Sequence, residues 1–184
     1  MNLANNLTVL RIVLVPLFVG TLLYYSPEKA YLKDVAAALF VIACLTDALD
    51  GYLARRMNEK TVLGSYIDPI ADKLLLLSGF LSLSLMSHLP PAMRIPAWVT
   101  IPIISRDVII LIGSTMIFVT TGTLKARPLW IGKVTTVCQM STLFFSLMMA
   151  PPALQICLFV LTVLFTVLSG VSYIRLGGQM LQTP

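Results

Sequence analysis

Short polar links divide the chain into about six apolar runs, each of the roughly 20 residues that a helix needs to cross a bilayer. The first run ends near residue 25, and the others cover about residues 35–55, 61–87, 97–121, 131–150 and 152–176. Hydrophobic residues make up 58% of the chain and charged residues only 11%, a composition far more apolar than that of a soluble domain. The sequence therefore predicts an all-α integral membrane protein that forms a single domain over residues 1–184.

Four aspartates interrupt the second and third apolar runs, namely Asp47, Asp50, Asp68 and Asp72. An unpaired charge inside a bilayer costs about 3 kcal/mol or more, so carboxylates placed here indicate a function or a bound cation. On helices, the members of each pair are three and four residues apart and project from one face. Four clustered carboxylates repel one another unless divalent cations neutralise them, and oxygen ligands suit Mg²⁺, Mn²⁺ or Ca²⁺. We therefore expect a metal site.

Small residues and an arginine accompany the aspartates. Gly51 and Gly64 remove side chains close to the acidic residues, which lets a bulky group approach the backbone, and Ala54 keeps the next turn small. Arg55 adds a guanidinium that can bind a phosphate through two parallel hydrogen bonds. Metal ligands, an arginine and accessible backbone together predict a site for a pyrophosphate group, in a recess that opens to one aqueous face.

The spacing of these residues resembles the signature of the CDP-alcohol phosphatidyltransferases. That signature reads Asp-x-x-Asp-Gly-x-x-Ala-Arg, then eight residues, then Gly-x-x-x-Asp-x-x-x-Asp, and every fixed position is filled in this chain. A lone Asp-x-x-Asp occurs by chance in many helices, whereas this longer pattern across two apolar segments is a specific match. The matching residues are Asp47, Asp50, Gly51, Ala54, Arg55, Gly64, Asp68 and Asp72.

The resemblance implies an enzyme that transfers the phosphatidyl group of CDP-diacylglycerol to the hydroxyl of a second alcohol and releases CMP. It implies a two-metal site for Mg²⁺ or Mn²⁺, with Asp47, Asp50 and Asp68 as ligands. Asp72 would serve as the general base and as a shared ligand. The partners implied are membrane lipids and a small alcohol, with no nucleic acid. The residues expected to bind CDP-diacylglycerol are Gly51, Ala54, Arg55 and Gly64.

The acceptor alcohol is less strongly determined by the sequence. The chain resembles the branch whose acceptors carry glycerol, and enzymes of that branch that use glycerol-3-phosphate typically show Arg-Glu in the fourth span and Gly-Lys-x-Lys-Thr before the fifth. Here the fourth span has Arg106-Asp107, and Gly132-Lys133 is followed by Val-Thr-Thr, so one expected lysine is a threonine. We expect glycerol-3-phosphate as acceptor. The alternative is a cardiolipin synthase that uses CDP-diacylglycerol and phosphatidylglycerol, and inositol phosphate is a further option.

Cations are the residues expected to bind the acceptor, because the metals would already hold the pyrophosphate. A structural pairing with the adjacent Asp107 is the alternative role for the arginine in the fourth span. The acceptor-binding candidates are Arg106, Arg127, Lys133 and Arg175.

The distribution of cations predicts the topology. With six spans both termini share a side, and seven Lys or Arg residues flank the spans on that side against three on the other. The positive-inside rule then places both termini and the active site at the cytoplasmic face of the cell's inner membrane. The seven are Arg55, Arg56, Lys60, Lys125, Arg127, Lys133 and Arg175, and the three are Lys29, Lys33 and Arg94.

Two other classes of membrane protein share part of this pattern. Membrane prenyltransferases also use two aspartate-rich motifs, but these stand far apart in sequence and lack Gly-x-x-Ala-Arg. A cation transporter could use intramembrane aspartates, typically with broken helices or internal repeats, and no repeat is visible here.

A homodimer is expected from the resemblance and from small residues such as Ser78 and Ser82 that could line a helix contact.

For several other residues the sequence does not require a functional role. Arg11 either extends to the membrane interface or lies near substrate. His88, in a loop rich in proline, is expected to face water without a functional role. Cys44, Cys138 and Cys157 lie in apolar runs without metal-ligand spacing and are expected to be small buried residues.

Overall fold

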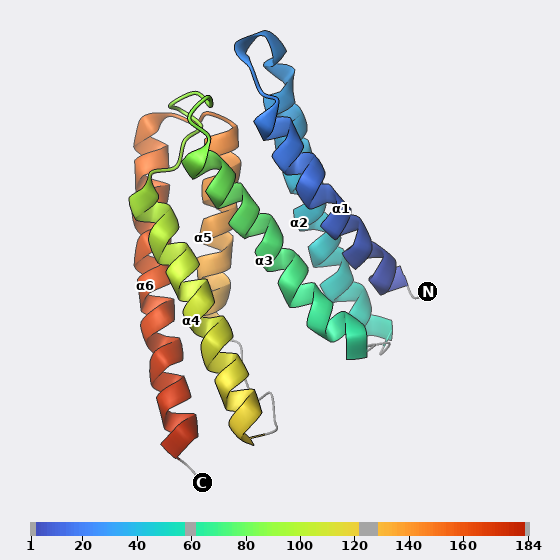
Figure 1. The fold of residues 1–184 in the computed structure, drawn as a ribbon, viewed down its shortest axis with the longest axis vertical. Helices are drawn as coiled ribbons and strands as arrows, with labels where there is room; N and C mark the ends of the chain where they lie inside the picture. Colours follow the sequence, from blue (N-terminus) through green and yellow to red (C-terminus); the bar gives the residue numbers. More distant parts are fainter. Residues whose placement is uncertain (1–2, 58–61, 122–128, 183–184) are drawn as a thin grey trace. The chain divides into compact units, whose positions relative to one another are not determined.

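The computed structural model describes the backbone of residues 3–57, 62–121 and 129–182, and within these ranges the side chains of residues 10–46, 73–113, 115, 129–176 and 178. These residues form six α-helices and one short 3-10 turn, and no strand occurs among them (Figure 1). The all-α prediction is confirmed. The helices are α1 (Leu3–Leu23), α2 (Tyr31–Met57), α3 (Val62–Leu85), α4 (Ala97–Thr121), α5 (Trp130–Leu147) and α6 (Pro152–Gln182), and the turn is η1 (Pro27–Lys29).

The helix boundaries follow local chemistry. α2 begins four residues before the predicted residue 35, because the backbone N–H of Lys33 already bonds the carbonyl of Ala30 at 3.2 Å and its ammonium pairs with Asp34 at 3.5 Å. α5 ends before Met149, whose positive φ of 50° is left-handed and cannot continue the helix. Pro151 then separates α5 from α6.

The chain divides into two compact units, and α5 contributes to both. The first unit contains Met1–Arg94 and Leu143–Ala150. In it α1 packs against α2 and α3, and α2 also touches α3. Phe18 and Phe40 are buried with their ring centroids 6.2 Å apart, and Phe80 is fully buried as well. In an apolar solvent, close van der Waals packing of such side chains is a main favourable term that holds helices together.

The second unit contains Ile95–Thr142 and Pro151–Pro184, and its interior is partly polar. α4 packs against α6, and the Trp98 ring meets Phe159 edge-on at a centroid distance of 6.3 Å. Between α5 and α6 the hydroxyls of Thr142 and Thr162 are 2.7 Å apart, and that of Thr135 donates to the carbonyl of Phe165 at 3.0 Å. Hydrogen bonds between buried hydroxyls and carbonyls are a common way to join helices in an apolar solvent.

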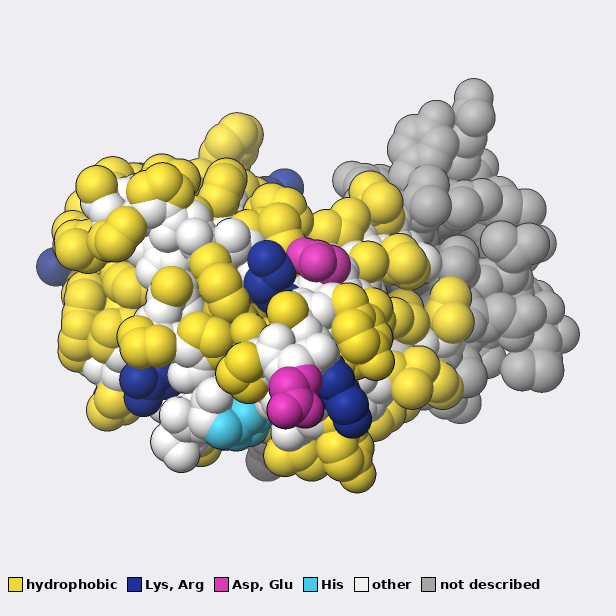
Figure 2. All heavy atoms as spheres, turned by 90° about the horizontal axis from the view of Figure 1, so that it is seen from above, with side chains coloured by type: hydrophobic (Ala, Val, Ile, Leu, Met, Phe, Trp, Pro, Cys, Tyr) yellow, Lys and Arg dark blue, Asp and Glu magenta, His cyan; other side chains and the backbone are white. Residues whose placement is uncertain are grey.

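The distribution of side chains on α6 is the reverse of that on a helix in a soluble protein. Four of its polar residues are buried, namely Gln155, Thr162, Thr166 and Ser169. Its outward face exposes large apolar side chains, which water would not favour but lipid would. In the end-on view of Figure 2 most of the coloured side chains are likewise hydrophobic and the charged ones are few. The exposed apolar residues of α6 are Leu154, Ile156, Val160, Leu161, Leu164, Val167, Leu168, Val171 and Ile174.

One helix segment in the described part of the chain, Pro152–Leu176, is long and apolar enough to cross a membrane, with a mean hydropathy of 2.3. Two shorter apolar segments, Leu10–Leu23 and Lys73–Leu85, accompany it. The predicted start of the last span at Pro152 is therefore confirmed, whereas the helix itself continues beyond the predicted Leu176 to Gln182. The prediction that there are six spans stays a prediction.

The predictions for Arg11, His88 and the cysteines agree with the structure only in part. Arg11 is fully buried, so of the two roles left open by the sequence, extension to the membrane interface does not fit. His88 is exposed as expected, but its Nε2 also lies 2.9 Å from the carbonyl oxygen of Leu22 near the end of α1. All three cysteines are free, yet Cys157 is exposed, because it lies among the outward apolar residues of α6. The prediction of burial was wrong for Cys157, and Cys44 and Cys138 are only half-buried.

Candidate functional site

The acidic motif lies on two neighbouring helices of the first unit. The last third of α2 carries Asp47 and Asp50, and the first half of α3 carries Asp68 and Asp72. Because both stretches are α-helical, each pair lies about one turn apart on one helix face. The end of α2 and the start of α3 lie at the same end of the unit, beside the start of α1 (Figure 1).

The side chains of the motif lie outside those that the structure describes. This holds for the four aspartates and also for Gly51, Ala54, Arg55 and Gly64. Their predicted roles in metal and CDP-diacylglycerol binding therefore stay predictions. The backbone is compatible with a shared site, because α2 and α3 touch. Residues three or four positions apart on two touching helices can combine their oxygen ligands.

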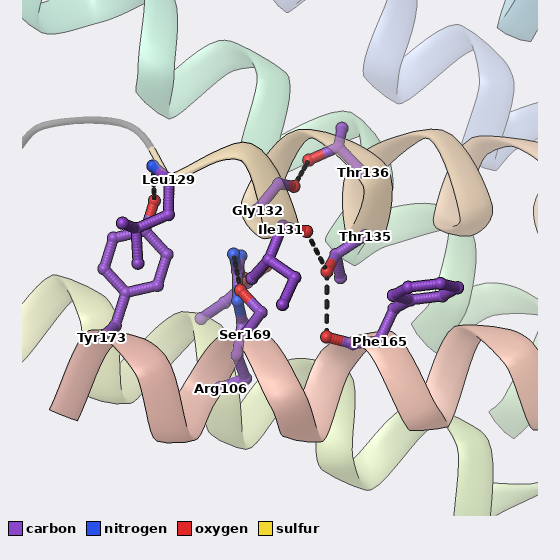
Figure 3. Close-up of polar contacts among 10 residues, drawn as sticks. Arg106, Leu129, Ile131, Gly132, Thr135, Thr136, Phe165, Ser169 and Tyr173 are labelled. Atoms are coloured by element: carbon purple, nitrogen blue, oxygen red, sulfur yellow. Dashed lines mark hydrogen bonds and ion pairs between the residues drawn. The ribbon is translucent and has the colours of Figure 1, made fainter. Parts of the chain in front are cut away.

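Arg106 is the centre of a polar cluster in the second unit (Figure 3). It is 7% exposed, and its Nη1 donates to Asp107 Oδ1 at 2.7 Å. Its Nη2 donates to the hydroxyl of Ser169 on α6 at 2.8 Å. The guanidinium carbon also lies 5.5 Å from the centroid of the Tyr173 ring, which is within the range of a cation–π contact. We call Arg106, Asp107, Gly132, Ser169 and Tyr173 the Arg106 cluster.

The start of α5 closes over this cluster. The Tyr173 hydroxyl accepts a hydrogen bond from the backbone N–H of Leu129 at 3.3 Å, just before α5 begins. A Cβ at Gly132 would lie 3.1 Å from that hydroxyl and 3.3 Å from Arg106 Nη2. Glycine at this position thus lets α5 approach both groups closely, because with a larger residue each of them would have to shift by a few tenths of an ångström.

Burial of the Arg106 charge is offset by its neighbours. A buried ion that loses its partner typically costs about 3 to 5 kcal/mol, so the 2.7 Å pair with Asp107 is important for the stability of α4. If Arg106 had a purely structural role, its ion pair with Asp107 would be sufficient. The Ser169 hydroxyl, the Tyr173 ring and the glycine opposite add constraints on orientation that a structural ion pair does not need.

The acceptor-binding candidates occupy different environments. Arg106 is buried, whereas Lys133 in the first turn of α5 and Arg175 on α6 are exposed. Arg127 lies outside the described residues. Lys133 follows Gly132 directly, so it lies in the same turn of α5 that approaches the Arg106 guanidinium.

Sequence reasoning missed Ser169 and Tyr173. They lie 63 and 67 positions beyond Arg106 in the chain, and only the packing of α4 against α6 brings them to it. Their i, i+4 spacing on an otherwise apolar helix is the signal that could have indicated them, since polar residues within a membrane segment normally face a protein partner.

Comparisons with known proteins agree with the motif. The family model for CDP-alcohol phosphatidyltransferase matches residues 1–168. A protein of Mycobacterium tuberculosis named probable phosphatidylglycerophosphate synthase is 36% identical over 179 residues, which cover 94% of this chain and 80% of that protein. The CDP-diacylglycerol--glycerol-3-phosphate 3-phosphatidyltransferase of Bacillus subtilis is 34% identical over 199 residues, covering 99% and 98%.

A relative from Escherichia coli K12 with the same name as the Bacillus protein is 34% identical over 145 residues, or 77% of this chain and 74% of the relative. The similarity thus extends well beyond the aspartate motif and includes relatives from distant bacteria. The chain belongs to the CDP-alcohol phosphatidyltransferase family.

Proposed function

We propose that this protein is a phospholipid-synthesising enzyme that transfers the phosphatidyl group of CDP-diacylglycerol to glycerol-3-phosphate, giving phosphatidylglycerophosphate and CMP. The observation that carries this proposal is the match to the Bacillus subtilis enzyme, which is named for that reaction and aligns over 98% of its own length. The complete acidic motif on α2 and α3 supplies the residues that such a reaction needs.

The acidic motif is the proposed place of the chemistry. Asp47, Asp50 and Asp68 would hold two Mg²⁺ or Mn²⁺ ions, with Asp72 shared, since clustered carboxylates are the donors that these hard cations prefer. The metals, when bound, supply charge that stabilises the phosphorus centre and the departing CMP. Asp72 accepts the proton of the acceptor hydroxyl as the oxygen attacks.

The remaining motif residues would orient the nucleotide lipid. Gly51, Ala54 and Gly64 leave room along α2 and α3 for the cytidine and the pyrophosphate. Arg55 adds a fixed, bidentate phosphate donor near the end of α2.

The acceptor needs cations of its own, because glycerol-3-phosphate brings a dianionic phosphate. Arg106 and Lys133 are the proposed ligands, with Arg127 and Arg175 as further contributors. The Arg106 cluster supports this, since it orients the guanidinium beside the turn of α5 that carries Lys133.

We further propose that all six helices cross the inner membrane, with both termini and the acidic motif at the cytoplasmic face. Two observations support this proposal. If successive helices cross the membrane in alternating directions, the helix ends on the side of the two termini carry the excess of Lys and Arg residues. In addition, α6 has an outward apolar face and buried polar residues. A cytoplasmic site would meet the water-soluble acceptor directly.

Two parts of the sequence-based interpretation receive less support. Cardiolipin synthesis from phosphatidylglycerol stays the alternative, because Thr135 occupies the place of a lysine typical of enzymes that use glycerol-3-phosphate. A homodimer rests chiefly on family resemblance, because Ser82 is buried within the first unit, and Ser78 is half-buried with its hydroxyl bonded to the Leu75 carbonyl of its own helix.

Acceptor-dependent release of CMP tests the proposal. Purified protein in mild detergent should release CMP from CDP-diacylglycerol when glycerol-3-phosphate and Mg²⁺ are added, and should stop when a chelator is in excess. No CMP release with any alcohol acceptor would favour a transporter or prenyltransferase and contradict the proposal.

A further inference from the structure

We propose that Ser169 is a positioning residue for the acceptor site: its hydroxyl orients the Arg106 guanidinium so that the free N–H groups of that guanidinium receive the phosphate of the acceptor. The inference rests on the proposed function, because it takes the acceptor to be a phosphorylated alcohol. It assigns a role to a side chain that neither the motif nor the topology indicates.

The hydrogen-bond inventory of Arg106 is the first step. A guanidinium has five N–H donors, two on each terminal nitrogen and one on Nε. One donor of Nη1 bonds Asp107 and one donor of Nη2 bonds Ser169, while Nε is buried without a hydrogen-bond partner. One donor thus remains at each of the three nitrogens, which suits a group with several oxygens such as a phosphate.

The orientation of the guanidinium is the second step. Its plane is constrained by the Tyr173 ring at 5.5 Å and its edge by Ser169 at 2.8 Å. Its aliphatic stem passes Gly170, where a Cβ would lie 3.6 Å from Arg106 Cγ. Three positions on one face of α6 therefore hold a single side chain of α4, and little rotational freedom remains to be lost when an anion binds.

The charge balance distinguishes Ser169 from Asp107. The carboxylate of Asp107 neutralises the guanidinium that it orients, and so weakens its attraction for a second anion. The hydroxyl of Ser169 is neutral and orients Nη2 without lowering the positive charge. Of the two hydrogen-bond partners, Ser169 is the one whose contact serves binding of an anion.

The test uses the intact protein in detergent with CDP-diacylglycerol and varied glycerol-3-phosphate. Ser169→Ala should raise the KM for glycerol-3-phosphate by about tenfold, the scale of one hydrogen bond to a charged group, with kcat and the KM for CDP-diacylglycerol within about twofold of the unmodified protein. Ser172→Ala is the matched control, because its hydroxyl bonds the Leu168 carbonyl of its own helix, and it should change neither constant.

An isosteric pair removes the ambiguity of a folding defect. Ser169→Thr and Ser169→Val add the same bulk, but only threonine keeps the hydroxyl, so only Ser169→Thr should retain the low KM for glycerol-3-phosphate. Equal behaviour of the pair, or an unchanged KM in Ser169→Ala, would overturn the inference. A protein that makes no phosphatidylglycerophosphate in any variant would instead contradict the proposed function.

Discussion

Arg106 on α4 and Ser169 on α6 are joined by a buried hydrogen bond of 2.8 Å, although 63 positions separate them in the chain. This contact connects the arginine of the apolar helix α4 to the buried polar face of α6. Because Gly132 approaches the same guanidinium from α5, three helices of the second unit meet at one charge.

Gly132→Ala should weaken acceptor binding. The added methyl would lie 3.1 Å from the Tyr173 hydroxyl and 3.3 Å from Arg106 Nη2, so one of them must move. We expect the KM for glycerol-3-phosphate to rise about fivefold or more, as expected for the partial loss of a charge-assisted contact. Gly113→Ala on α4 is the control, because nothing lies within 4 Å of its added methyl, and both KM values should stay unchanged. Parallel effects in the two variants would show that the loss is general.

Tyr173→Phe and Tyr173→Leu should differ in effect. Phenylalanine keeps the ring over the Arg106 guanidinium and loses only the hydroxyl that accepts from Leu129 N–H, whereas leucine removes the ring. A cation–π contact of this kind is worth about 0.5 to 2 kcal/mol, so Tyr173→Leu should bind glycerol-3-phosphate several-fold more weakly than Tyr173→Phe. Acceptor titrations of the two variants check this, and equal KM values would assign the ring no part in holding Arg106.

Asp72→Asn should separate binding from transfer. An amide keeps the shape of the side chain and some coordination but cannot accept a proton, so CDP-diacylglycerol should still bind while kcat falls by about 100-fold or more. Equilibrium binding of CDP-diacylglycerol and single-turnover rates should be measured on the same preparation. Should binding and turnover decline together, Asp72 would be chiefly a metal ligand.

Lys133→Ala should act on the acceptor alone. Lys133 is exposed in the first turn of α5, where its ammonium is accessible to a phosphate, so its loss should raise the KM for glycerol-3-phosphate about tenfold. The KM for CDP-diacylglycerol should scarcely change. Lys29→Ala, an exposed lysine of η1, provides the matched charge control. If both substrates were affected alike, Lys133 would belong to the nucleotide-lipid site instead.

The presence and order of the helices could be predicted from the sequence, because each contains a long apolar run. The limits expected for the fourth span agree with Ala97–Thr121, and the last span begins at Pro152 as expected. The start of α2 was missed because Lys33 and Asp34, which pair with each other, interrupt its first turn after Tyr31 and Leu32, and the continuous apolar run begins only at Val35. Periodicity cannot reveal a helical turn that carries no apolar pattern.

The candidate site was predictable in part. Asp47 to Asp72 form a local motif, so their grouping follows from spacing on two adjacent helices. Ser169 and Tyr173 could not be connected to Arg106 in this way, because the connection depends on how α4 packs against α6. The burial of Arg11 was missed for the same reason, since the face that α1 turns toward α2 and α3 is set by packing.

The identity of the lipid product tests the central claim most directly. Purified protein should be given CDP-diacylglycerol, Mg²⁺ and either labelled glycerol-3-phosphate or labelled phosphatidylglycerol, in separate reactions, and the labelled lipid formed should be identified. The account predicts phosphatidylglycerophosphate from the first reaction and little or no product from the second. Cardiolipin from the second reaction, with no phosphatidylglycerophosphate from the first, would contradict the account.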